Sequence, residues 1–310
     1  MPSSLIESSS HIVLVAHINP DADSMGAACA FYSYLLRSQK KLTLFCASND
    51  IDQRLAFLPW FEKLTQRFPD DADCVICFDC GSYSRLGIDT TLPLINIDHH
   101  ESNDGYGTHA IINISAISTT QVVYEYFVAN SVKINGKIAT ALYAGLLDDS
   151  KCFSLGKCDA KTFAMAHHLI QSGADHAMCT DWLYRRRSLA SLRMKGRLLS
   201  QMKLLGDGRI ALFEVTLGLL EETGATLIEC KQILDEALEM RFIQAALMII
   251  EHPKGGSKIS LRTDGEVNAA KIIKEFGGGG HATRSGARHK QNNDSELINN
   301  LITMITKELV

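Results

Sequence analysis

The sequence lacks several features that mark particular classes of protein. No apolar run reaches the roughly 18 residues that a membrane-spanning helix needs, because charged or turn residues interrupt each run. The N-terminus lacks the basic start and apolar stretch of a signal peptide. Positive charge is not in excess either, since 31 Lys and Arg residues against 35 Asp and Glu residues give a formal net charge of −4. We therefore expect a cytoplasmic protein that binds neither a membrane nor long duplex nucleic acid.

A disulfide framework is also not expected. The nine cysteines are odd in number and scattered along a long chain, which is typical of reduced thiols. What the chain does have is ample core material: 46% of its residues are hydrophobic and 21% are charged, which excludes intrinsic disorder. Its 310 residues suggest about two domains.

The first half alternates short apolar runs with helical patterns, which predicts an α/β fold with βαβ units and a mainly parallel sheet. We expect strands at 12–16, 42–47, 74–79 and 94–98. Helices are expected at 24–38, 119–130, 137–147 and 161–172. The expected first domain comprises residues 1–183.

A smaller α/β domain is expected to follow at 207–310, after a basic connecting helix at 184–206. The turn Gly206-Asp207-Gly208 marks its start. Strands are expected at 209–215, 245–250 and 258–262, and helices at 227–240, 267–276 and 294–309.

Acidic residues and histidines follow the expected strands, where open α/β sheets bind their ligands. Any one of them could be a helix cap or a solvated turn residue, but four such clusters at strand and helix ends indicate a metal site. Mixed nitrogen and oxygen ligands suit a divalent metal such as Mn²⁺. The clusters are His17, Asn19, Asp21, Asp23 and Ser24; Asp79; Asp98, His99 and His100; and Asp148 with Asp149.

These motifs resemble a known family. Asp98-His99-His100, together with His17-x-Asn19-Pro20-x-x-Asp23, resembles the DHH phosphoesterase family, and the run Gly277–Gly280 followed by His281 resembles the motif of its DHHA1 domain. The compact layout is most similar to the branch of nano-RNases that are also phosphatases of 3′-phosphoadenosine-5′-phosphate (pAp). The resemblance implies an active site in the cleft between the two domains.

The resemblance also implies roles for individual residues. His17, Asp21 and Asp79 match a first metal site, and Asp23, Asp79, His99 and Asp149 a second, for two Mn²⁺ ions with Mg²⁺ or Co²⁺ as alternatives. His100 matches the histidine that faces the scissile phosphate, and Asp98 the acid that orients it. The family has Asp-Thr-Gly where this chain has Asp149-Ser150-Lys151, so Asp148 stays an alternative ligand to Asp149.

In the second domain, the resemblance implies a substrate-binding strand and loop. Arg262 could bind a phosphate through two parallel hydrogen bonds. Arg284 stands where relatives have a small residue, and either contacts phosphate or is a solvated charge. The implied set is Ser260, Arg262, Gly278, Gly279, Gly280, His281 and Arg284.

The activity that we expect is metal-dependent hydrolysis of short oligoribonucleotides to mononucleotides and of pAp to AMP. A pApA or cyclic-di-AMP phosphodiesterase is the alternative. A RecJ-type exonuclease and a family II pyrophosphatase fit less well, and a non-catalytic nucleotide-binding protein is the rival from another class. Apolar helices near 198–204 and 297–305 could bury a homodimer surface, and the polarity of degradation stays open.

Three further patterns favour structural interpretations. Cys74-x-x-Cys77-x-x-Cys80 has metal-like spacing, but alternation along a strand would point Cys74 and Cys77 to opposite faces. The run Arg185–Arg187 suits a solvated helix face better than a nucleic-acid patch. Ser118-Thr119-Thr120 is expected to cap a helix, although its donors could also meet substrate.

Overall fold

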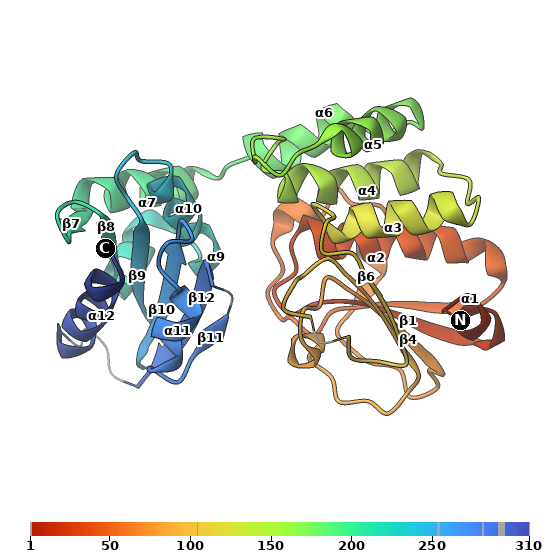
Figure 1. Ribbon diagram of the computed structural model, residues 1–310, viewed down its shortest axis with the longest axis horizontal. Helices are drawn as coiled ribbons and strands as arrows, with labels where there is room; N and C mark the ends of the chain where they lie inside the picture. Colours follow the sequence, from red (N-terminus) through yellow and green to blue (C-terminus); the bar gives the residue numbers. More distant parts are fainter. Residues whose placement is uncertain (1, 104, 253–254, 281, 291–294, 310) are drawn as a thin grey trace. The chain divides into compact units, whose positions relative to one another are not determined.

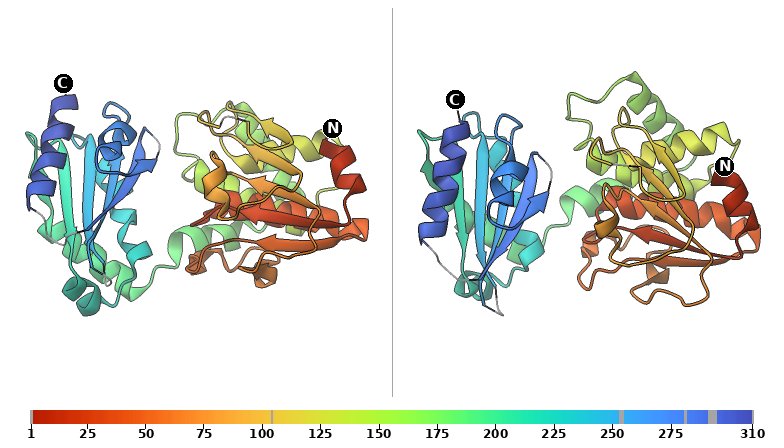
Figure 2. Two further views of the ribbon diagram at one scale, coloured as in Figure 1. Left: turned by 90° about the horizontal axis from the view of Figure 1, so that it is seen from below. Right: turned by 60° about the horizontal axis from the view of Figure 1, so that its bottom comes forward.

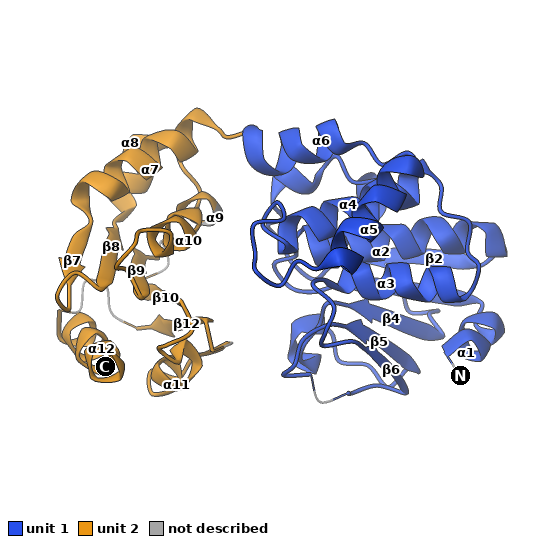
Figure 3. Cartoon of the chain, turned by 45° about the horizontal axis from the view of Figure 1, so that its top comes forward, with its two compact units in different colours: residues 1–186 blue, residues 187–310 orange. Residues whose placement is uncertain are grey.

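The structure is a computed structural model that describes the chain except residues 1, 104, 253–254, 281, 291–294 and 310. Two compact units divide it, residues 1–186 and residues 187–310 (Figure 3). Each unit has its own sheet and its own cores. The units are described separately below.

Unit 1 contains a six-stranded sheet in the order β3-β2-β1-β4-β5-β6, in which every neighbouring pair is parallel. The strand order reverses direction between β1 and β4, and open α/β sheets bind ligands at the carboxyl ends of the strands at such a point. The central strands are buried on both faces, which explains their continuous apolar sequences. The strands are β1 (His11–Ala16), β2 (Lys41–Phe45), β3 (Leu64–Thr65), β4 (Cys74–Phe78), β5 (Leu94–Asp98) and β6 (His109–Ile112).

Helices cover one face of this sheet, and loops with short helical turns cover the other (Figure 1). The helices α2 and α4 approach closely at Gly26, where a Cβ atom would lie 2.4 Å from the carbonyl oxygen of Ala141. The helices are α1 (Pro2–Ser8), α2 (Ala22–Leu35), α3 (Thr119–Ala129), α4 (Gly136–Asp149), α5 (Ala160–Gln171) and α6 (His176–Thr180). The short turns are η1 (Leu36–Ser38), η2 (Gln53–Leu55), η3 (Phe61–Lys63), η4 (Tyr83–Leu86) and the π-helical η5 (Asp181–Arg185).

Unit 2 has a mixed sheet in the order β11-β12-β10-β9-β8-β7, in which β8 and β9 are parallel and the other pairs antiparallel. The helices α11 and α12 pack on one face (Figure 2), and α7 to α10 pack on the other. The strands are β7 (Lys203–Leu205), β8 (Ile210–Val215), β9 (Ala245–Glu251), β10 (Ser257–Thr263), β11 (Gly279–Gly280) and β12 (Arg284–His289). The helices are α7 (Leu189–Gln201), α8 (Leu217–Thr223), α9 (Leu227–Cys230), α10 (Gln232–Leu238), α11 (Ala269–Lys274) and α12 (Ser295–Glu308).

The α/β fold with a parallel first sheet is confirmed, and details differ from the sequence-based expectation. The helix expected at 227–240 is interrupted, since α9 ends at Cys230 and α10 begins at Gln232. The segment 184–206 contains α7, which packs on α8, α9 and β8 inside unit 2. Among the described residues, none of the helices has the length and apolar composition needed to cross a membrane.

Candidate metal centre

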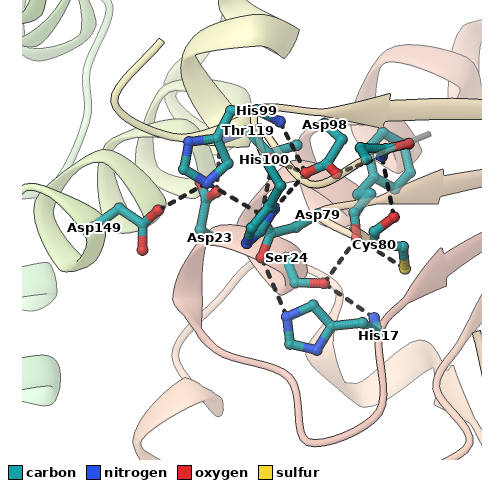
Figure 4. Close-up of polar contacts among 12 residues, drawn as sticks. His17, Asp23, Ser24, Asp79, Cys80, Asp98, His99, His100, Thr119 and Asp149 are labelled. Carbon is teal, nitrogen blue, oxygen red and sulfur yellow. Dashed lines mark hydrogen bonds and ion pairs between the residues drawn. The ribbon is translucent and has the colours of Figure 1, made fainter. Parts of the chain in front are cut away.

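Asp79 lies at the centre of a cluster of carboxylates and imidazoles at the carboxyl ends of β1, β4 and β5 (Figure 4). Its backbone φ of 60° is left-handed, a region that Asp tolerates better than most residues. Oδ2 of Asp79 lies 3.1 Å from Nε2 of His17, and Oδ1 lies 3.5 Å from Nε2 of His99. Burial would raise the pKa of Asp79, but the hydrogen bond and charge of His17, with the charges of His100 and His99, outweigh it and lower that pKa.

The first candidate ligand group consists of His17, Asp21 and Asp79, whose donor atoms all lie within 4.8 Å of one another. His17 follows β1, and its backbone N–H donates to the hydroxyl of Ser24, which in turn donates to the carbonyl oxygen of Phe78. Asp21 is the N-cap of α2 and accepts from the N–H of Ser24. One serine therefore fixes the ends of β1 and β4 and the start of α2 around this group.

The second candidate group consists of Asp23, His99 and Asp149. Asp23 is completely buried and accepts hydrogen bonds at 2.6 and 2.9 Å from the backbone N–H groups of Thr119 and Thr120, and at 2.7 Å from the Thr120 hydroxyl. These donors form the first turn of α3, whose positive dipole end stabilises an anion. Oδ2 of Asp149 lies 3.3 Å from Nε2 of His99.

The two adjacent acids at the end of α4 face different neighbours. Asp149 belongs to the group with His99 and Asp23. Oδ2 of Asp148 instead accepts a long hydrogen bond, 3.4 Å, from the N–H of Ala22, and its Oδ1 lies 3.8 Å from Nζ of Lys151. The geometry therefore favours Asp149 as the metal ligand.

The last turns of α4 pack closely against the candidate metal ligands. A Cβ atom on Gly145 would lie 2.7 Å from Oδ1 of Asp23 and 2.5 Å from Cγ2 of Thr120, so a side chain there would displace the carboxylate. Beyond the end of α4, Lys151, Cys152 and Phe153 have φ values of 49°, 57° and 62°. The sequence resemblance implies glycine at the position of Lys151, and glycine adopts that conformation without strain.

His100 and Asp98 form a tightly coupled pair beside the two ligand groups. Nδ1 of His100 lies 2.7 Å from Oδ1 of Asp98, whose Oδ2 accepts from the side-chain amide of Asn103 at 2.5 Å. Burial lowers the pKa of His100, but the hydrogen bond to Asp98 and the charge of Asp79 raise it to about 9. Burial raises the pKa of Asp98, and the bond to His100 more than offsets this, so that the pKa of Asp98 is lowered. The two side chains therefore stabilise each other's charged forms in the metal-free protein.

The crowded carboxylates of the cluster repel one another, which favours binding of a cation among them. The pKa of Asp23 is well above its ordinary value, through burial and then through the charges of Asp79 and Asp21. The pKa of Asp149 is raised by burial and by Asp23, Asp21 and Asp79. A cation bound among these oxygens and imidazole nitrogens would relieve both effects, so the residues fit a pair of divalent metal ions.

The structure also brings to the centre an arginine that the sequence did not mark and a threonine from the predicted helix cap. The guanidinium of Arg85, in η4, lies 2.8 Å from Nε2 of His17, and no motif pointed to this arginine. Thr119 donates its hydroxyl to Oδ1 of Asp79 at 2.9 Å, while Ser118 is the expected N-cap and accepts from the N–H of Gln121. The donors of α3 thus hold acidic side chains of the cluster.

The candidate substrate residues of unit 2 that the structure describes lie on β10, β12 and β11, with Gly278 directly before β11. Arg262 and Arg284 are cross-strand partners and both approach Asp235, at 3.6 and 3.3 Å. Ser260 pairs with Gly286, which pairs with Gly279 on β11. Gly280 has a φ of 149°, and a Cβ on Gly278 would lie 2.4 Å from the carbonyl oxygen of Gly286. His281 lies outside the described residues.

The structural interpretation of the cysteine motif is confirmed. Cys74 lies in the core on the helix-covered face of the sheet, and Cys77 and Cys80 lie in the core on the other face. The candidate metal groups found among the described residues contain no cysteine.

The arginine run makes local ion pairs. Arg186 pairs with Asp181 and stacks its guanidinium on Trp182, and Arg187 pairs with Glu236.

Comparisons with known proteins match both halves of the chain to families. The DHH family N-terminal domain matches residues 11–146, and the DHHA1 domain matches residues 210–309. Two curated proteins called bifunctional oligoribonuclease and PAP phosphatase NrnA are similar over most of both chains. The Bacillus subtilis (strain 168) protein is 26% identical over 283 residues, which cover 89% of this chain and 88% of its own. The Thermus thermophilus protein is 27% identical over 305 residues, which cover 96% of this chain and 90% of its own.

Other relatives match differently. The cyclic-di-AMP phosphodiesterase GdpP of Bacillus subtilis is 27% identical over 96% of this chain, but the match covers only 48% of GdpP. The solved structure of an exopolyphosphatase-related protein from Bacteroides fragilis has a TM-score of 0.90, with 21% identity over 98% of this chain and 94% of that one, which establishes the same fold. Both family domains occur in this chain in sequence, each in its own unit. With a DHH domain and a DHHA1 domain that together span about three quarters of its length, the chain belongs to the DHH phosphoesterase family.

Proposed function

We propose that this protein hydrolyses short oligoribonucleotides to mononucleotides and pAp to AMP, using two divalent metal ions, with Mn²⁺ as the expected metal and Mg²⁺ or Co²⁺ as alternatives. The observation that carries the proposal is the convergence of overlapping groups of possible metal ligands, two of which contain Asp79, beside the ion pair of Asp98 and His100. The substrate class is supported by relatives named for oligoribonuclease and PAP phosphatase activity, which match this chain over most of their own length.

The proposed ligands are divided between two ions. His17, Asp21 and Asp79 would hold one ion, and Asp23, Asp79, His99 and Asp149 the other. Metal ions bound in this way lower the pKa of water and neutralise charge on phosphoryl oxygens. The chain itself contributes rigidity, because Asp23 is held by three hydrogen bonds from the start of α3 and His17 by its own backbone bond to Ser24.

His100 is proposed to act on the substrate directly. Asp98 holds the ring through Nδ1, and the Nε2 atom is proposed to contact a phosphate oxygen. In its protonated form, His100 would donate from Nε2 to negative charge that develops on the phosphoryl group.

Unit 2 is proposed to bind the part of the substrate that does not react. Arg262 and Arg284 would contact a phosphate, Ser260 would add a hydroxyl, and the backbone of Gly278–Gly280 would allow close approach, followed by His281. A cytoplasmic location and a homodimer stay predictions.

The test is turnover by the purified protein with Mn²⁺. The panel comprises pApA, a pentanucleotide RNA, a long single-stranded RNA, pAp, cyclic-di-AMP and pyrophosphate. Fast release of mononucleotides from the two short RNAs and of phosphate from pAp, with the long RNA spared, is the expected result. Turnover restricted to cyclic-di-AMP would leave the metal chemistry in place and overturn the substrate assignment.

Two variants make the test specific for the site. Asp79→Asn and His100→Ala should each remove turnover, because the first loses a ligand proposed for both ions and the second loses the proposed proton donor. His167→Ala, at an exposed position of α5, is the matched histidine control and should keep wild-type turnover. Equal rates for wild type and Asp79→Asn would refute the proposed centre.

A further inference from the structure

One face of the unit 2 sheet presents a row of cations that extends beyond Arg262 and Arg284. In an antiparallel pair, directly opposite residues point to the same face. The register pairs Arg262 with Arg284, Ser260 with Gly286, and Lys258 with Arg288. These residues therefore share one face, with one pair of cations at each end of the row. The two pairs are four residues, or about 13 Å, apart along β10.

The opposite face of the same strands is apolar and covered. Ile259 and Leu261 of β10 and Ala287 of β12 are buried in the core that α11 and α12 complete. On the cationic face, α7 to α10 cover the β8 and β9 part, where Met248 and Ile250 lie in the second core. This second core contains no described residue of β10 or β12, and α10 alone of these helices packs extensively on β10.

A further cation approaches this row from the helical side. Lys231, the N-cap residue of α10, has its pKa lowered to about 8, first by burial and then by the nearby charges of Lys258 and Arg262. One carboxylate, Asp235, lies close to Arg262 and Arg284. The neighbouring cations repel one another in the free protein. A bound anion would attract each of them and so offset this repulsion.

Arg262 also has unused hydrogen-bonding capacity. Its Nε is buried and has no hydrogen-bond partner, since Asp235 is 3.6 Å away. A buried donor without a partner is costly, and a phosphate oxygen would satisfy it. The row therefore combines excess positive charge with an unpaired donor, as an anion-binding surface requires.

We propose that Lys231, Lys258 and Arg288 extend the phosphate site of Arg262 and Arg284 into a track for the backbone of an oligonucleotide. This inference rests on the proposed function and adds to it the residues that select for chain length. Each additional phosphate would meet a further cation as far as Lys258, near the first residue of β10, Ser257. A mononucleotide would use one end of the track, and a trinucleotide would use its length.

The test is binding of pA, pApA and pApApA to the full chain in EDTA, where metal-dependent turnover is absent, measured by isothermal titration calorimetry. The wild-type affinity should rise with each phosphate. Lys258→Met should reduce the ratio of the trinucleotide affinity to the mononucleotide affinity on the order of tenfold, as expected for the loss of one charged hydrogen bond. It should also flatten the salt dependence of trinucleotide binding by about 0.7 in the log–log slope.

Two further variants separate the track from general charge and from folding. Lys274→Met removes the same charge from an exposed position on α11, whose apolar residues pack on the other face of the sheet, and should keep the wild-type ratio. Lys258→Arg keeps a cation on the track and should retain the length dependence.

Equal ratios for Lys258→Met and Lys274→Met would overturn the proposal. If binding in EDTA grew with length but no substrate were turned over with metal, the proposed function would fail and the track would stand. Turnover of short RNA with length-independent binding would overturn the track alone.

Discussion

Replacing Gly145 with alanine tests whether the packing of α4 sets the position of a metal ligand. The new Cβ would lie 2.7 Å from Oδ1 of Asp23 and 2.5 Å from Cγ2 of Thr120, both closer than real Cβ contacts. Overpacking of this kind costs about 1–3 kcal/mol, while alanine inside a helix gains up to about 1 kcal/mol over glycine. Gly196→Ala in α7 has the same helix gain with no atom within 4 Å of the new Cβ. The free energies of unfolding of the two variants should therefore differ by the overpacking cost, about 1–3 kcal/mol, with Gly145→Ala the less stable.

The assay is urea unfolding of both variants, together with calorimetric titration of Mn²⁺. Since Asp23 must move away from the donors of α3, Gly145→Ala should weaken metal binding by about 10–100-fold, the range found when the support of a ligand is lost. Thr120→Ser on the Gly145→Ala background removes Cγ2 and should recover part of the stability. Wild-type metal affinity in Gly145→Ala would refute the claim that this glycine positions Asp23, even if the variant were less stable.

Three other predictions follow from described contacts. Asp149→Asn should weaken Mn²⁺ binding by at least about tenfold in the same titration, and Asp148→Asn should have a much smaller effect; the reverse order would make Asp148 the ligand. Lys151→Gly should raise the free energy of unfolding by up to about 1 kcal/mol in urea, because the left-handed φ costs a non-glycine residue about 1–2 kcal/mol and glycine's unfolded-state entropy offsets part of the gain. The Lys231 pKa of about 8 in the folded state lies below that of the unfolded chain, so the unfolded state binds more protons between these values, and stability should rise with pH above about 8 in wild type relative to Lys231→Met. Urea midpoints measured at about pH 7.5 and 9.5 that moved identically in both proteins would contradict this last prediction.

The sequence predicted most clearly the strands that are buried on both faces, and it also predicted β2 and β10, which are only partly buried. β1, β4 and β5 read as continuous apolar runs because helices cover one side and loops the other. β6 and β12 were not expected. Both keep exposed or half-buried positions along their length, and the sequence of β12, from Arg284 to His289, is polar at most positions.

Some features of the candidate metal site could likewise be predicted from the sequence, and others could not. Its ligands could be predicted because they follow strand ends and carry the family motif. The support of Asp23 by Thr119 and Thr120 could not, because it joins segments about a hundred residues apart through hydrogen bonds that leave no sequence pattern. The choice between Asp148 and Asp149 also needed the structure, since adjacent residues on a helix point about 100° apart and only the course of α4 decides which one faces His99.

The proposed ligands span sequence positions 17 to 149, and all of them lie in unit 1. A site assembled from such distant segments forms only when the central strands have paired and α4 has docked on α2, so a metal held by the proposed ligands would bind after unit 1 has folded. Metal uptake would therefore report that unit 1 has completed folding. During synthesis, the earliest moment at which the nascent chain could bind metal is set by the appearance of Asp149, while unit 2 is still being made.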